Sequence, residues 1–323
     1  MICRRNRLSG GVREVYMDLE TLKRKMAEER YIYDETLITV LYVALRLNRP
    51  LLIEGAAGVG KTEIAKVMAA ALDRELVRMQ CYEGLDESKS LYEWNYQKQL
   101  LSIQVNMGAR DSDELTRSLF SDEYLLERPL LKSIRSEKPV VLLIDEIDKS
   151  DEEFEAFLLE LLSDMQVSIP EIGTVKAVTV PFVVLTSNRA RPISDALRRR
   201  CAYLYIEYPD PEKELAILRA RLPHIDEQLA VQVVRAVQKF RASETVLKKP
   251  SIAETLDWAQ ALDALGVREL TPEIMRGTVG FVLKNNEDID LLDEILAEEC
   301  GDPDCTGDHD NCQHNHEHHH HHG

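Results

Sequence analysis

Eight consecutive residues, GAAGVGKT from Gly55 to Thr62, have the types and spacing of a phosphate-binding loop. They match G-x-x-x-x-G-K-[ST], and they lie between an apolar run, LLIEG, and a helix-like run, KTEIAKVMAAALD. Glycines let backbone N–H groups wrap phosphates, and the N-terminus of the helix adds a favourable dipole. Lys61 is expected to reach the β- and γ-phosphates of ATP, and Thr62 to place its hydroxyl on Mg²⁺. A glycine-rich turn that binds nothing is the alternative, which the complete motif in this context disfavours. The predicted nucleotide-binding residues are Gly55, Ala56, Ala57, Gly58, Val59, Gly60, Lys61, Thr62 and Glu63.

Two acidic residues follow a second apolar run, VVLLIDEID. Ligands of a parallel sheet bind at the carboxyl ends of its strands, where Asp145 and Glu146 are expected to lie. Asp145 suits a contact with Mg²⁺ through water, and Glu146 suits the base that polarises an attacking water. The sequence leaves two roles for Asp148, a local cap and a functional acid. A helix is predicted to follow, with Ser150 as its N-cap and Glu153 completing a capping box.

A third apolar run, FVVLTSN, ends at Asn188 and is expected to lie beside VVLLIDE in the sheet. A side-chain amide at that position can contact the γ-phosphate or hold the attacking water. The alternative is a simple turn asparagine. Three consecutive arginines then occur in SDALRRRCAYLYI. They either form a solvated helix end, since cations suit a helix C-terminus, or provide an arginine finger for the nucleotide of a neighbouring subunit.

Strand-like and helix-like segments alternate between residues 50 and 209, which predicts a parallel sheet covered by helices on both faces. After Pro209 and Pro211 only amphipathic helical patterns follow. The predicted division is an N-terminal leader and helix (residues 1–30), a nucleotide-binding core (31–209), a helical lid (210–299) and a disordered His/Cys/Asp-rich tail (300–323).

The charge of this 323-residue chain is unevenly distributed. The formal net charge is −17, of which −11 falls between Gly280 and Gly323. An acidic body is a poor electrostatic match for a nucleic-acid backbone, so we expect no nucleic-acid partner. No apolar run approaches the length of a transmembrane helix, and the basic first residues lack the apolar centre of a signal peptide. We therefore expect a cytoplasmic protein, with Met1 or Met17 as the start.

The last 24 residues hold three of the six cysteines and eight of the nine histidines. Their context is rich in aspartate, unlike that of a plain purification tag, so a native tail is favoured. Thiolates and imidazoles together suit Ni²⁺, Zn²⁺ or copper, and the irregular spacing favours a loose multi-ion site. The predicted metal ligands are Cys300, Cys305, His309, Cys312, His314, His316, His318, His319, His320, His321 and His322.

The motifs GAAGVGKT, LLIDEID, LTSN and ALRRRC, in this order, resemble those of an AAA+ ATPase. The segments CYEGLDESKSLYEWNYQKQLLSIQV and MQVSIPEIGTVKAVTVPFVVLTSN resemble the helix insertion and the hairpin of the MoxR family. CYEGLD, LYEWNYQ and KPSIAETLDW are most similar to its CoxD-like branch, which is associated with maturing the metal centre of molybdenum-containing carbon monoxide dehydrogenases and related hydroxylases.

The resemblance implies an α/β P-loop fold with a five-stranded parallel sheet in the order 5-1-4-3-2 and a smaller helical lid. It also implies a homo-hexamer, and a partner that carries a von Willebrand A domain. By position, Arg200 matches the arginine finger of the family, and Arg199 is the second choice. The second sensor, usually an arginine, is unassigned, because Ile252 stands near its place and Lys248 or Lys249 are the nearest cations.

The function favoured by the sequence is ATP hydrolysis coupled to remodelling of a client protein, with assembly of a metalloenzyme centre as the preferred task. An activator of an inhibited enzyme, similar to Rubisco-activating relatives, is the alternative within this class. An AAA+ motor on nucleic acid, a small-molecule P-loop kinase and a metal-storage module are the alternatives outside it. The acid pair, the sensor asparagine and the arginine run favour hydrolysis over the kinase.

Overall fold

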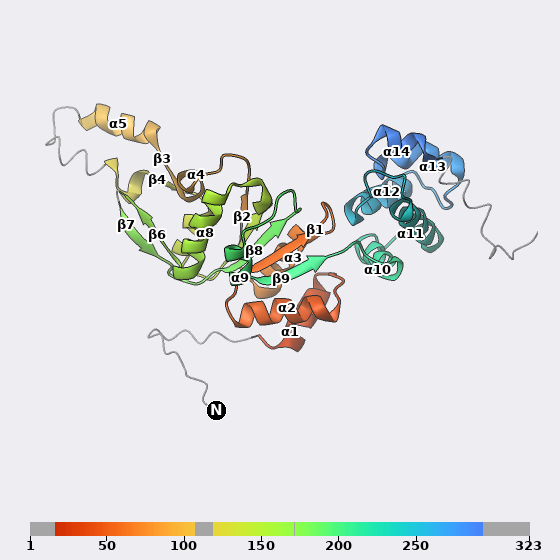
Figure 1. Cartoon of the computed structure of the whole chain (residues 1–323), viewed down its shortest axis with the longest axis horizontal. Coiled ribbons are helices and arrows are strands. Elements are labelled where there is room, and N and C mark those ends of the chain that lie inside the picture. The colour runs from red at the N-terminus through yellow and green to blue at the C-terminus, as the bar shows by residue number, and fades with distance from the viewer. Residues whose placement is uncertain (1–16, 107–118, 171, 293–323) are drawn as a thin grey trace, which may run out of the picture.

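A parallel sheet of five strands forms the centre of the core (Figure 1). The computed structural model describes residues 17–106, 119–170 and 172–292. The strands of the sheet are β1 (Leu51–Gly55), β2 (Leu76–Gln80), β5 (Val141–Asp145), β8 (Phe182–Ser187) and β9 (Ala202–Ile206), in the order β2-β5-β8-β1-β9. When these five alone are numbered along the chain, the order read from β9 is 5-1-4-3-2, as the resemblance implies.

Alternating side chains of the central strands enter two separate hydrophobic clusters, one on each face of the sheet. Leu142 and Ile144 of β5 enter one cluster, while Val141 and Leu143 enter the other. All five residues of β5 are buried, as expected for a parallel strand that is covered on both sides. The central strands are therefore rigid supports for whatever their carboxyl ends carry.

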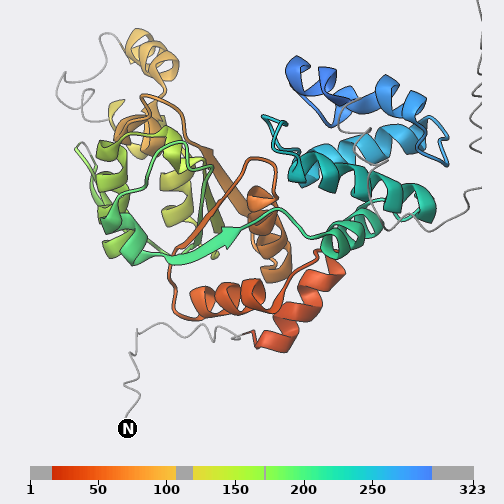
Figure 2. The ribbon, with the colours of Figure 1, turned by 45° about the vertical axis from the view of Figure 1, so that its right-hand side comes forward.

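Helices cover both faces of the sheet (Figure 1). One face is covered by α1 (Leu19–Glu28), α2 (Glu35–Arg46) and α3 (Lys61–Leu72). The other is covered chiefly by α4 (Glu87–Leu91), α7 (Pro129–Arg135), α8 (Glu152–Asp164) and α9 (Asp195–Arg200). A helix, α5 (Tyr96–Asn106), stands at the far end of the core from the lid in both ribbon views (Figure 2).

Two small antiparallel ladders lie outside the main sheet. They join β3 (Tyr92–Trp94) to β4 (Leu125–Glu127), and β6 (Gln166–Ile169) to β7 (Gly173–Lys176). The second ladder lies where the sequence resembles the hairpin before the first sensor. Short 3₁₀ turns occur at Asp122–Tyr124, Ile147–Lys149 and Val279–Phe281.

The N-cap of α8 lies one residue after the predicted position. Asp151 caps this helix, because its carboxylate accepts a hydrogen bond of 2.8 Å from the N–H of Phe154. The hydroxyl of Ser150 instead donates to the carbonyl of Ile147 and closes the preceding 3₁₀ turn. An apolar stripe of this helix, which includes Phe154 and Leu158, packs into the core.

The lid consists of helices with their own hydrophobic cluster. They are α10 (Pro211–Arg221), α11 (Glu227–Ala242), α12 (Ile252–Ala264), α13 (Pro272–Thr278) and α14 (Asn286–Asp290). A buried carboxylate, Glu214 of α10, accepts two hydrogen bonds of 2.7 Å from Arg241 of α11 and a third from Thr255 of α12. This network ties three helices together inside the lid.

Within residues 17–106, 119–170 and 172–292, no helix has the length and apolar character needed to cross a membrane.

Candidate functional site

The phosphate-loop residues connect the end of β1 to the start of α3. Gly58 and Gly60 have φ angles of +75° and +96°, which side chains other than hydrogen disfavour. The Lys61 ammonium donates to the carbonyls of Gly55 and Ala56, at 2.8 and 2.6 Å. Burial lowers the pKa of Lys61, an effect opposed by the nearby acids, Asp148 first. The lysine is thus held inside the loop, where incoming phosphates would replace the carbonyls as its partners.

Thr62 and Asp145 lie in contact although 83 residues separate them. The Thr62 hydroxyl is 3.1 Å from Oδ1 of Asp145, a carboxylate that is 3% exposed. A hydroxyl and a carboxylate are oxygen ligands that a hard cation such as Mg²⁺ prefers. Asp145 also accepts hydrogen bonds from Thr186 of β8 and from Arg78 of β2. These two residues therefore fit the predicted Mg²⁺ position.

Glu146 has a left-handed backbone, with φ at +57°. Such a conformation is uncommon for a residue with a side chain, and it persists only where neighbours fix it. The Glu146 N–H donates to the Thr186 hydroxyl at 2.9 Å. Its carboxylate accepts from Asn188 at 3.1 Å and from Gln80 at 2.7 Å, and it pairs with Lys149 at 2.6 Å. The acid that the sequence singled out is thus held in one orientation from three sides.

Asn188 follows β8 directly, and its amide reaches Glu146 of the neighbouring strand end. Asp148 positions this segment, because its Oδ2 accepts hydrogen bonds from the N–H groups of Asn188 and Ala190, at 3.1 and 2.8 Å. Asp148 is 4% exposed, and its Oδ1 has no hydrogen-bond partner among the described residues. The geometry favours the capping alternative for Asp148, with a charge that also acts on Lys61.

The three arginines of α9 differ in their partners. Arg198 forms an ion pair of 2.5 Å with Glu54, a buried residue of β1. Arg200 donates to the Ser163 hydroxyl at 3.0 Å and is exposed. Arg199 is exposed, and its side chain has no hydrogen bond or ion pair with any other residue that the structure describes. Arg198 is therefore held by an ion pair within its own chain, while Arg199 and Arg200 lie at the surface.

The lid contacts the phosphate loop directly. The N–H of Ala253, in the first turn of α12, donates to the carbonyl of Gly58 at 3.3 Å. A Cβ at Gly58 would collide with the hydroxyl of Ser251, the N-cap of that helix. Beside this contact lies a cavity of about 450 Å³ between core and lid, with apolar walls that include Leu37 and Leu256. Its position and walls suit a nucleobase.

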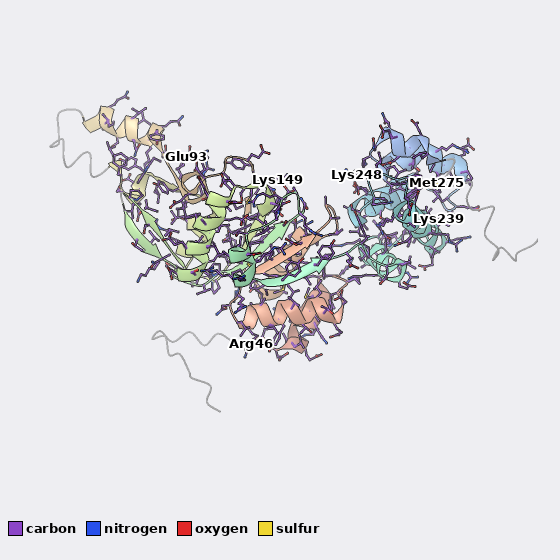
Figure 3. All side chains as sticks on the ribbon, viewed as in Figure 1. Arg46, Glu93, Lys149, Lys239, Lys248 and Met275 are labelled. Carbon is purple, nitrogen blue, oxygen red and sulfur yellow. The ribbon has the colours of Figure 1, made fainter. Side chains whose placement is uncertain are left out.

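The helix α12, where the second sensor is expected, contains no arginine. Ile252 lines the cavity as an apolar wall. The Lys249 ammonium donates to the carbonyl of Ser243, and Lys248 is exposed at the end of the lid nearest the core in Figure 3. Another cation reaches the phosphate-loop helix instead, since Arg221 of α10 pairs with Glu63 of α3.

Comparison with known proteins gives the family of this core. Residues 50–201 match the model of the AAA domain, dynein-related subfamily. The match spans β1 to the end of α9, and so contains the phosphate loop, the acid pair, Asn188 and the arginine run. The core of this chain is an AAA+ ATPase domain. The match does not support a finer assignment to the MoxR family or to its CoxD-like branch.

Curated relatives of this AAA+ chain are distant. An uncharacterised protein of Staphylococcus saprophyticus is 23% identical over 244 residues, covering 73% of this chain and 84% of that protein. The Lon protease of Halothermothrix orenii is 29% identical over 236 residues, which is 66% of this chain but only 26% of Lon. Among solved structures, the RuvB Holliday junction branch migration motor of Thermotoga maritima covers 84% of this chain at 16% identity, with a TM-score of 0.43. Its A156S mutant covers 87% at 18% identity, with a TM-score of 0.48.

Several residues of this site were missed by the sequence analysis. Gln80 ends β2, so the rule that placed Asp145 and Asn188 at strand ends could have found it. No motif marks Arg78, two residues earlier on β2, or Thr186, inside β8. Their contacts with Asp145 can be recognised only when the order of the strands in the sheet is known. Arg221 lies 158 residues from its partner Glu63. The predicted tail ligands, residues 300–322, lie outside the described residues; within the described part, no group of three metal-binding side chains occurs.

Proposed function

We propose that this AAA+ ATPase uses ATP hydrolysis to remodel a client protein during assembly of a metalloenzyme centre. The observation that carries the remodelling step is the contact of the lid helix α12 with Gly58 of the phosphate loop. Because the same loop is expected to bind the phosphates, their arrival, cleavage and release act on the lid contact. Hydrolysis is thereby coupled to movement of the lid relative to the core, which is the motion a remodelling enzyme needs.

Within the nucleotide site we assign a role to each residue that the sequence predicted. The residues from Gly55 to Glu63 bind the nucleotide, with Lys61 on the phosphates. Thr62 and Asp145 hold Mg²⁺, which when bound offsets the negative charge that develops on the phosphates. Glu146 accepts a proton from the attacking water, and Asn188 orients that water or the γ-phosphate.

We further propose that the active form is a homo-hexamer in which Arg200 or Arg199 reaches the nucleotide of the neighbouring subunit. Their exposure supports this, as does the commitment of Arg198 to Glu54. An arginine at the transition state contributes about 10³–10⁵ in rate in related phosphoryl transfers.

A mixing experiment tests the finger. Arg200→Ala, or Arg199→Ala if that residue is the finger, is expected to bind nucleotide and lose ATPase activity. Mixing the inactive variant with Lys61→Ala should restore some activity, because mixed interfaces pair an intact pocket with an intact arginine. Absence of rescue at every ratio, in rings shown to contain both variants, would contradict a finger supplied in trans.

The metal-centre task is supported by the composition of residues 300–323 and by the resemblance to the CoxD-like branch. We propose that this tail binds Ni²⁺, Zn²⁺ or copper, that a molybdenum hydroxylase is the client, and that a von Willebrand A domain protein is the partner. Truncation after Glu299 should leave ATP turnover intact and abolish binding of several metal ions per chain. The client should then accumulate with an incomplete metal centre. Full metal loading of the client in cells that express only the truncated form would refute this task.

A further inference from the structure

The first turn of the lid helix α12 contacts the nucleotide site through its backbone. The N–H of Ala253 donates to the carbonyl of Gly58 at 3.3 Å. Ile252 and Leu256 of the same turn line the cavity that suits a nucleobase. The helix contains no lysine, arginine or histidine that could reach the phosphates. A backbone group cannot be redirected by a change of rotamer, so this contact depends on where the start of the helix is held.

The segment that leads into α12 is held from α14, the last helix of the lid. Asp288 of α14 accepts a hydrogen bond of 2.7 Å from the N–H of Leu247, and its other oxygen accepts one of 3.2 Å from the N–H of Lys248. Figure 3 places Lys248 at the end of the lid nearest the core. Asp288 is 0% exposed, and a buried carboxylate costs free energy unless hydrogen bonds occupy its oxygens. Its bonds therefore hold two consecutive backbone groups in place.

The few residues between these backbone groups and α12 form a tight connection. Arg241 of α11 donates to the carbonyl of Pro250 at 2.7 Å. Ser251 then caps α12 through a capping box with Glu254. A position that Asp288 fixes is thus passed along a short, bonded segment to the first turn of α12, which meets the phosphate loop.

We propose that Asp288 is a positioning residue for ATP binding, which sets the first turn of α12 on the phosphate loop. Without its carboxylate, the start of α12 leaves Gly58 in part of the molecules, and the cavity loses one of its walls. Only the remaining molecules bind ATP tightly, so the apparent affinity falls in proportion. The inference rests on the nucleotide site proposed above, and it adds a residue that acts on that site from the end of the lid sequence.

The test compares Asp288→Ala with the parent as full chains. We expect KM for ATP to rise at least about fivefold, because two buried backbone N–H groups lose their acceptor. The value of kcat should stay within about twofold, because saturating ATP draws the population into the bound form. Hydrogen–deuterium exchange gives the local readout. Exchange should be faster over residues 251–256, which include the Ala253 amide, and unchanged over residues 258–264.

Thr278→Val is the matched control for a loss of lid stability. Thr278 accepts a hydrogen bond of 2.9 Å from the indole N–H of Trp258, and it is not one of the residues that line the cavity. The variant leaves that buried N–H unpaired, so it should lower the denaturant midpoint as Asp288→Ala does. It should leave KM and the exchange of Ala253 as in the parent. An equal rise of KM in both variants would overturn the positioning role, since lid stability alone would then explain it.

A second variant, Asp288→Asn, covers the case in which the alanine variant does not fold. It keeps the shape of the side chain and one acceptor oxygen, so it should raise KM in the same direction by less, about twofold. Faster exchange at Ala253 with an unchanged KM would overturn the inference and leave the nucleotide site intact. Absence of ATP binding in the parent chain would instead refute the nucleotide site, and this inference with it.

Discussion

Glu214 in the lid and Asp145 in the core are both almost completely buried carboxylates bound by an arginine. The difference lies in the arginine. The side chain of Arg241 is 7% exposed and is further fixed by its bond to the carbonyl of Pro250. The side chain of Arg78 is 52% exposed and borders a cavity.

This difference separates a structural ion pair from one that can change during function. The lid network joins residues of α10, α11 and α12 to one another and to the carbonyl of Pro250, so it stabilises the lid. In the core, Asp145 is shared among Arg78, Thr62 and Thr186. A carboxylate with several partners, of which one, Arg78, is half exposed, can exchange that partner for Mg²⁺, whereas a pair closed on both sides cannot.

The largest expected effect concerns stability. Arg241→Ala should lower the free energy of unfolding of the lid by about 3–5 kcal/mol, because it leaves the Glu214 charge buried and unpaired. Denaturant unfolding followed by the fluorescence of Trp258, a buried residue of α12, measures this change. Arg78→Ala is the matched control, and it should cost no more than about 1 kcal/mol because its arginine is half exposed. Equal losses in the two variants would remove the distinction between the two pairs.

The second expected effect concerns the orientation of Glu146. Asn188→Ala should lower kcat about 10- to 100-fold with little change in KM, because the amide acts on the water or the transition state rather than on ground-state binding. Steady-state ATPase kinetics give both constants. Asn188→Asp keeps the shape and loses the N–H donor, so it should be as slow. A rise in KM with unchanged kcat would assign Asn188 to nucleotide binding alone.

A smaller effect is expected where the lid meets the core. Arg221→Ala removes the ion pair with Glu63 of α3 and should weaken nucleotide binding about two- to fivefold. Arg219→Ala, on the same helix, removes an ion pair within the lid and should leave nucleotide affinity unchanged. Titration with a fluorescent ATP analogue compares the two. Identical affinities would exclude a role for the Arg221 contact in closing the lid.

The same contact predicts a weak dependence on acid. Burial raises the pKa of Glu63, but hydrogen bonds and charge from Arg221 and Lys66 outweigh it and bring the pKa below its ordinary value of 4.5. A lowered pKa means that the contact stabilises the closed lid above that value and is lost as the pH falls below it. Nucleotide affinity should fall more steeply over this acid range in the parent than in Arg221→Ala. Parallel pH profiles would show that Glu63 does not contribute.

Sequence patterns predicted the parts of this fold that depend on local rules. The phosphate loop needs glycines at fixed spacing, and apolar runs mark the buried strands whose ends carry Asp145 and Asn188. What the patterns could not supply are contacts between distant segments, such as Arg78 with Asp145 or Arg221 with Glu63. These depend on which strands are neighbours and on how the lid meets the core. The N-cap at Asp151 was missed because Ser150 and Asp151 both suit a cap, and only the preceding 3₁₀ turn decides between them.

The most direct test of the account is ATP binding and turnover measured together in Glu146→Gln. The substitution keeps the shape of the side chain and its bond from Asn188, but it removes the base that accepts the proton of water. We expect ATP affinity close to that of the parent and turnover at least about 100-fold lower. Near-normal turnover in Glu146→Gln would contradict the role of Glu146, and with it the hydrolysis mechanism assigned to this site.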